Sequence, residues 1–90
     1  MSKDEFLEFL KLQQFPEPVL VEQPADGGLD VHTHDFEVIA LVIEGSIIVC
    51  CAETESLYEP GQVFYLAFRQ PHSERYGRNG VKYLASRKSQ

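Results

Sequence analysis

Two of the three histidines in this 90-residue chain, His32 and His34, stand one residue apart. Because successive side chains of an extended strand alternate between its faces, these two would lie on the same face. Two neutral imidazoles on one face can bind one transition metal, and His72 could supply a third nitrogen. Imidazole ligands suit Zn, Fe, Mn, Ni or Cu, so the pattern predicts a divalent transition metal without identifying it. Taken alone, the pair is a weak indication of a site.

Other residues could contribute to a ligand pocket. Arg69 precedes His72 closely and could hold the carboxylate of an anionic ligand, although pairing with surface acids is the commoner role of such an arginine. Tyr65 and Tyr76 could line the same pocket or simply pack in the core or at an interface.

Composition narrows the class of protein. Apolar residues make up 43% and charged residues 24% of the chain, as in ordinary globular domains, and the length predicts one domain over residues 1–90. No segment approaches the roughly 18 apolar residues of a membrane span, and the acidic start, Met1 to Glu5, does not resemble a secretory signal. The net charge of −6 argues against a nucleic-acid partner.

The two cysteines, Cys50 and Cys51, are sequence neighbours. A disulfide between them would be strained, so we expect reduced thiols and a cytoplasmic protein. On a strand they point to opposite faces, and one of them would enter the protein interior. A buried, chemically inert thiol is the more common outcome there, and a ligand or redox role is the alternative.

A short amphipathic helix is predicted for residues 3–13. Ser2 and Glu5 have the spacing of a capping box, and apolar residues from Phe6 to Leu12 recur at helical spacing. Pro16 prevents the helix from continuing further. Such a helix is too short to be stable alone, so its phenylalanine-rich face must dock on the rest of the domain or on a second subunit.

From Val19 onward the pattern is all β, with short apolar segments between turn residues. The sequence predicts strand breaks at Glu44–Gly45 and Pro60–Gly61, a tight hairpin turn at Asn79–Gly80, and a frayed tail from Arg87. Seven or eight short strands of this kind indicate a sandwich or barrel. The segments expected to be extended are 19–22, 29–34, 38–43, 46–51, 56–58, 63–66 and 81–84.

Two motifs resemble those of the cupin superfamily. The first runs from Gly27 through His32, His34 and Glu37 to Gly45, and the second comprises Pro60–Gly61, a strand, and Pro71–His72. The resemblance extends to small single-domain bacterial cupins of the cupin 2 and AraC-type sensor-barrel kind. It implies a cupin-type double-stranded β-helix, or jelly-roll barrel, over residues 19–86 with one short N-terminal α-helix.

The resemblance also implies metal ligands. It places His32, His34 and His72 at the family's ligand positions, with Glu37 as the candidate fourth ligand. The family's glutamate normally follows the second histidine after three intervening residues, a position held here by Val38, so Glu37 stands one residue early. On a straight strand Glu37 would face away from the interior, whereas a turn at Asp35–Phe36 could direct it to the metal.

Three functions remain open at this level. One is a small metal-binding cupin of unassigned reaction that acts on a small polar molecule. The second is a non-catalytic small-molecule-binding or sensor barrel, and the third is a structural dimer with a vestigial site. A homodimer is expected in any case, because exposed strand edges and the apolar helix face would be covered by pairing.

Overall fold

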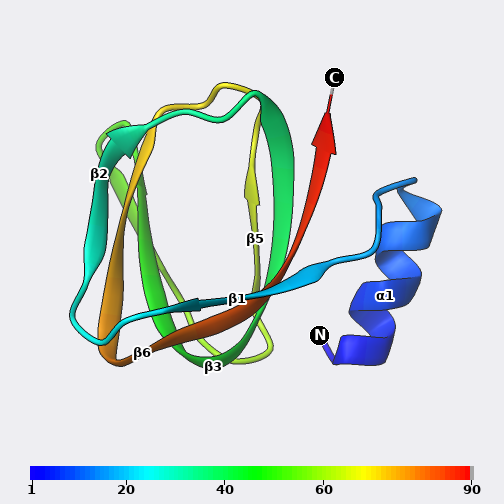
Figure 1. Cartoon of the computed structure of the whole chain (residues 1–90), viewed down its shortest axis with the longest axis horizontal. Helices are drawn as coiled ribbons and strands as arrows, with labels where there is room; N and C mark the ends of the chain where they lie inside the picture. Colours follow the sequence, from blue (N-terminus) through cyan, green and yellow to red (C-terminus); the bar gives the residue numbers. More distant parts are fainter. Residues whose placement is uncertain (90) are drawn as a thin grey trace.

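A computed structural model describes residues 1–89, which form one helix followed by six antiparallel strands around a common interior (Figure 1). This arrangement confirms the predicted all-β fold with a short leading helix. No helix within residues 1–89 is long and apolar enough to cross a membrane. The elements are α1 (Lys3–Leu12), β1 (Val19–Gln23), β2 (Gly28–His32), β3 (Phe36–Cys51), β4 (Thr54–Tyr58), β5 (Val63–Leu66) and β6 (His72–Ser89).

The two long strands, β3 and β6, pair with each other along most of their length and pass through both halves of the barrel. The first half of β3 and the second half of β6 lie between β5 and β1. The other halves lie between β4 and β2. The result is two four-stranded layers, β1-β6-β3-β5 and β2-β6-β3-β4, that share their central strands. This is the arrangement expected of a jelly-roll barrel.

Both long strands bend where the two layers meet. The register of β3 against β6 shifts between Val42 and Glu44 and again just after Gly45. Gly45 and Gly80 both have φ of +72°, and a Cβ on Gly45 would collide with the carbonyl oxygen of Gly80. The backbones therefore approach more closely than any side chain permits.

The observed pairing of β3 with β6 corrects three sequence predictions. The break at Glu44–Gly45 is a bulge inside one continuous strand, and Asn79–Gly80 lies within β6 rather than in a hairpin turn. A positive φ is shared by bulges and hairpin turns, so the residue types alone do not distinguish them. The expected frayed tail is also wrong for residues 87–89, which pair with the start of β3, and Gln90 lies outside the described residues.

The first half of β3 is buried on both faces. Val38, Ala40 and Val42 point into the barrel, where the main core collects. Ile39 and Leu41 point outward and are covered by α1. Burial on both sides explains why this segment reads as an unbroken apolar run. The buried residues of the main core are Val38, Ala40, Val42, Ile47, Val49, Phe64, Leu66, Tyr76, Val81, Tyr83 and Ala85.

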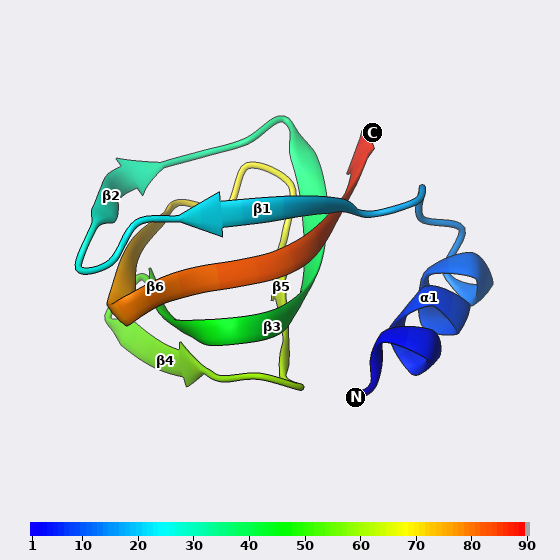
Figure 2. The ribbon, with the colours of Figure 1, turned by 60° about the horizontal axis from the view of Figure 1, so that its bottom comes forward.

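Helix α1 lies outside the barrel, against the layer formed by β3, β5 and β6 (Figure 2). The predicted capping box is present, with Ser2 and Glu5 bonded to each other's backbone amides. Phe6 is fully buried and Leu10 nearly so, and both pack on the outward side chains of β3. The expected docking of this helix on its own domain is therefore present.

Gly45→Ala should destabilise the fold by about 3 kcal/mol or more, because it combines a left-handed backbone with a collision against the carbonyl of Gly80. Gly61→Ala is the matched control, since Gly61 has φ of +90° but a Cβ there would make only ordinary van der Waals contact with Met1. It should lose only about 1 to 2 kcal/mol, the conformational penalty alone. Urea denaturation of both variants measures the difference, and equal losses would contradict the close strand approach.

Candidate metal centre

The three histidines meet at one end of the barrel interior. His32 ends β2 and stands directly opposite His72, the first residue of β6, in the strand register. His34 lies in the loop before β3, and its carbonyl accepts a hydrogen bond of 2.9 Å from the backbone amide of Arg69. This bond ties the loop to the segment that precedes His72.

The distances between the rings are short. Ring centroids lie 4.3 Å apart for His32 and His72, 4.8 Å for His32 and His34, and 5.2 Å for His34 and His72. One candidate ligand atom from each ring falls within 4.8 Å of the others. The structure thus brings together the three residues that the sequence singled out.

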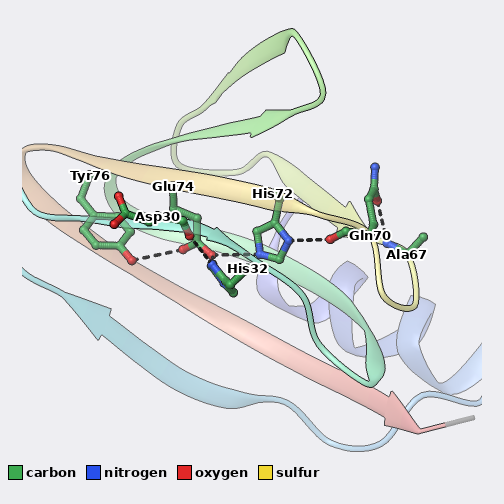
Figure 3. Close-up of polar contacts among 7 residues, drawn as sticks. All are labelled: Asp30, His32, Ala67, Gln70, His72, Glu74 and Tyr76. Carbon is green, nitrogen blue, oxygen red and sulfur yellow. Dashed lines mark hydrogen bonds and ion pairs between the residues drawn. The ribbon is translucent and has the colours of Figure 1, made fainter.

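Backbone carbonyls fix the tautomer of two of these rings (Figure 3). Nδ1 of His32 lies 2.7 Å from the carbonyl oxygen of Asp30, and Nδ1 of His72 lies 3.0 Å from that of Gln70. A carbonyl oxygen only accepts, so each neutral ring must carry its hydrogen on Nδ1 and its lone pair on Nε2. Gln70 is itself held by hydrogen bonds in both directions with Ala67.

The Nε2 atoms of His32 and His72 are buried and make no hydrogen bond within residues 1–89. The His72 side chain is 1% exposed. Buried polar atoms are rarely left without a partner, and leaving one so is destabilising. These two Nε2 atoms carry lone pairs of fixed orientation, as the nitrogen ligands of a transition metal must. The residues therefore fit a bound metal.

His34 is the more accessible part of the cluster. Burial lowers the pKa of its imidazole, and the nearby His32 and His72 lower it further, so neutrality of this ring is favoured. Its ring stacks on Phe36 at 4.8 Å between centroids. The guanidinium of Arg87 in turn lies 5.7 Å from the Phe36 ring centroid and places a positive charge on this side of the site.

Glu74 is a site residue that the sequence reasoning missed. It lies two residues after His72 on β6, so both side chains face the interior, and Glu74 is 7% exposed. Its Oε2 lies 3.3 Å from Nε2 of His72 and 3.6 Å from Nε2 of His32. Its Oε1 accepts a hydrogen bond of 3.2 Å from the Tyr76 hydroxyl (Figure 3).

The same period of two would have revealed Glu74 in the sequence, because residues 72, 74 and 76 share a face of any straight strand. Tyr76, predicted to line the pocket, contacts the site indirectly, because its hydroxyl donates to the Glu74 carboxylate that lies beside the histidines. Burial raises the pKa of the Tyr76 hydroxyl, and the charge of Glu74 raises it further. The phenol therefore stays protonated and can donate.

Glu37 lies apart from the three histidines. Its neighbour Val38 points into the core, so Glu37 shares the outer face of β3 with Ile39 and Leu41. There it accepts a hydrogen bond of 2.6 Å from the hydroxyl of Tyr65. Tyr65 is 51% exposed, and the hydrogen bond to Glu37 raises its pKa.

Arg69 is also on the surface, where its Nε donates a hydrogen bond of 2.9 Å to Asp35. Both partners are largely exposed, as in the surface pairing considered for this arginine. Cys51 is the cysteine that packs against the core, and burial raises the pKa of its thiol. Cys50 lies on the other face, and both cysteines are free thiols.

Comparison with known sequences now identifies the class of protein. The profile of the AraC-like ligand binding domain matches residues 19–86, and the chain belongs to this cupin-like family. The matched range coincides with the barrel. A search of curated proteins found no match.

Solved structures of cupins share the fold. A cupin superfamily protein from Desulfitobacterium hafniense superposes with a TM-score of 0.70 at 13% identity, covering 79% of this chain and 64% of that protein. KdgF from Halomonas sp. superposes with a TM-score of 0.67 at 16% identity, covering 83% of this chain and 73% of KdgF. The DMSP lyase DddQ from Ruegeria pomeroyi superposes with a TM-score of 0.70 at 20% identity, covering 78% of this chain and 36% of the lyase. The chain thus spans less than two thirds of the first and third of these proteins.

We expect the metal-free protein at neutral to mildly alkaline pH to hold His32 and His72 as the Nδ1–H tautomer, because each Nδ1 faces a carbonyl oxygen. Long-range ¹H–¹⁵N correlation spectra distinguish the two tautomers directly. Resonances of the Nε2–H form for both rings would contradict the proposed direction of the lone pairs.

Proposed function

We propose that this cupin domain binds one divalent transition metal through His32, His34 and His72 and presents it to a small molecule at the barrel opening. The observation that carries the proposal is the pair of buried Nε2 atoms without hydrogen-bond partners in residues 1–89. Backbone carbonyls on the opposite side of each ring hold these atoms in place. Such outer contacts are typical of histidines that bind metals.

The bound metal would supply a Lewis acid with open coordination positions, which can polarise and orient an oxygen-bearing ligand. The chain's own residues supply the rest of the site. His72 is buried, whereas His34 and Phe36 are partly exposed. Arg87, placed over Phe36, favours an anionic ligand there.

Replacement of His72 tests the metal site. Wild-type protein, stripped and then exposed to Zn²⁺ or Fe²⁺ without oxygen, should retain about one equivalent after dialysis. His72→Ala should bind at least about tenfold more weakly, since it removes the most buried ligand. Ser73→Ala is the matched control, because Ser73 follows on the same strand and faces the other way.

Elemental analysis measures the metal content, and calorimetric titration measures the affinity for the metal. Circular dichroism checks that the apo variants fold. A wild-type protein holding less than about a tenth of an equivalent, with no change in His72→Ala, would refute the metal site.

A non-catalytic sensor or binding barrel is the second candidate. The match to the AraC-like ligand binding domain favours it, because ligand binding is the role for which that family is named. The similar fold of a DMSP lyase favours turnover instead. Thermal shifts with small carboxylic acids, followed by product analysis for each acid that stabilises the metal-loaded protein, separate the two. Stabilisation without product supports the binding barrel, and product formation supports the enzyme.

A further inference from the structure

The carboxylate of Glu74 occupies an unusual position for a charged group. Its side chain is 8% exposed, and it lies beside His32 and His72 (Figure 3). The hydroxyl of Tyr76 donates to Oε1. The other oxygen, Oε2, faces Nε2 of both His32 and His72. A buried carboxylate is strongly destabilising unless a cation or several donors compensate it.

The two histidines, as neutral rings, do not provide that compensation. Their hydrogens are on Nδ1, so both Nε2 atoms present lone pairs to Oε2. Three electron-rich atoms then converge without a donor between them. At 3.3 Å and 3.6 Å from Oε2, neither Nε2 atom makes a hydrogen bond. A cation at the point of convergence would turn this repulsion into attraction.

The separations of Oε2 from the two Nε2 atoms are close to those of ligands around one ion. Donor atoms that lie about 2.1 Å from the same metal are about 3.0–3.4 Å apart in octahedral or tetrahedral geometry. The two separations measured from Oε2, 3.3 Å and 3.6 Å, are near this range.

We propose that Glu74 is the fourth protein ligand of the metal, bound through Oε2, with Tyr76 holding Oε1. This inference rests on the proposed three-histidine site and deepens it. The carboxylate comes from β6, the strand of His72, and not from Glu37 on the outer face of β3. Three nitrogens and one carboxylate oxygen favour ions such as Fe²⁺, Mn²⁺ and Co²⁺ more than three nitrogens alone.

Titration of the full chain with Co²⁺ tests the proposal, because this ion reports its ligands through visible absorption. Glu74→Gln should bind Co²⁺ about 10- to 100-fold more weakly than wild type and change the absorption bands. Glu37→Gln tests the competing carboxylate, and Glu55→Gln is a charge-matched control, since Glu55 pairs with Arg75 on the surface. The affinity of both control variants for Co²⁺ should stay within about twofold of that of the wild type.

The outcomes separate the two levels of the proposal. Wild-type affinity and spectrum in Glu74→Gln would overturn the role of Glu74 and leave the three-histidine site standing. Loss of affinity in Glu37→Gln alone would assign the carboxylate to Glu37 and overturn the role of Glu74 as well. A wild-type protein that does not bind Co²⁺ would refute the metal site and with it the fourth ligand.

A second measurement on the wild-type protein does not depend on how a variant folds. Infrared difference spectra between the apo and Co²⁺-loaded forms should show a shift of carboxylate stretching bands, because one oxygen becomes coordinated. Glu37→Gln should retain that shift. The absence of any carboxylate shift on loading would overturn the proposal even if Glu74→Gln fails to fold.

Discussion

The pairing of His32 with His72 across β2 and β6 is the constraint on which the site depends. It joins two segments that are 40 positions apart in the sequence and sets both rings on the interior side. Each ring is then oriented by a carbonyl of its own strand or approach segment, two residues before it. Strand register and local backbone thus determine together where the lone pairs point.

The long strands make this pairing possible in so small a domain. Because β3 and β6 each run through both layers, one bend at Gly45 and Gly80 closes the barrel. The interior holds apolar side chains such as Val38, Ala40 and Val42 together with His72 and Glu74, which are also buried. Helix α1 covers the outer face behind the apolar side chains and adds a second small core. Burial on both faces of β3 stabilises the fold and opposes the cost of burying polar atoms at the histidines.

Local patterns in the sequence were sufficient for several elements. The capping box predicted α1, because it depends on near neighbours in the chain. His32 and His34 meet as expected, but not through strand alternation, because β2 ends at His32 and His34 lies in the loop that follows. The contribution of His72 and the barrel came from the resemblance to cupins, since no local pattern places position 72 beside position 32. Alternation beyond His72 also places Glu74 on the face of that histidine, whereas the resemblance points to a carboxylate near the first motif.

Other features could not be read from residue types. Asn79–Gly80 satisfies the requirements of a hairpin turn, and its role as a bend became visible only through the pairing of β6 with β3 on both sides of it. The direction of the Glu37 side chain depended on whether the loop after His34 makes residue 37 or residue 38 face the barrel interior. Val38 in the core shows that alternation continues from that point, which places Glu37 outside.

Anomalous X-ray diffraction from crystals of the metal-loaded protein, recorded on both sides of the metal's absorption edge, tests the central claim most directly. We expect a peak in the barrel interior about 2.0–2.2 Å from Nε2 of His32 and His72, with the Nδ1 hydrogen bonds to Asp30 and Gln70 intact. A peak bound through Nδ1, or one found only on the surface, would contradict it.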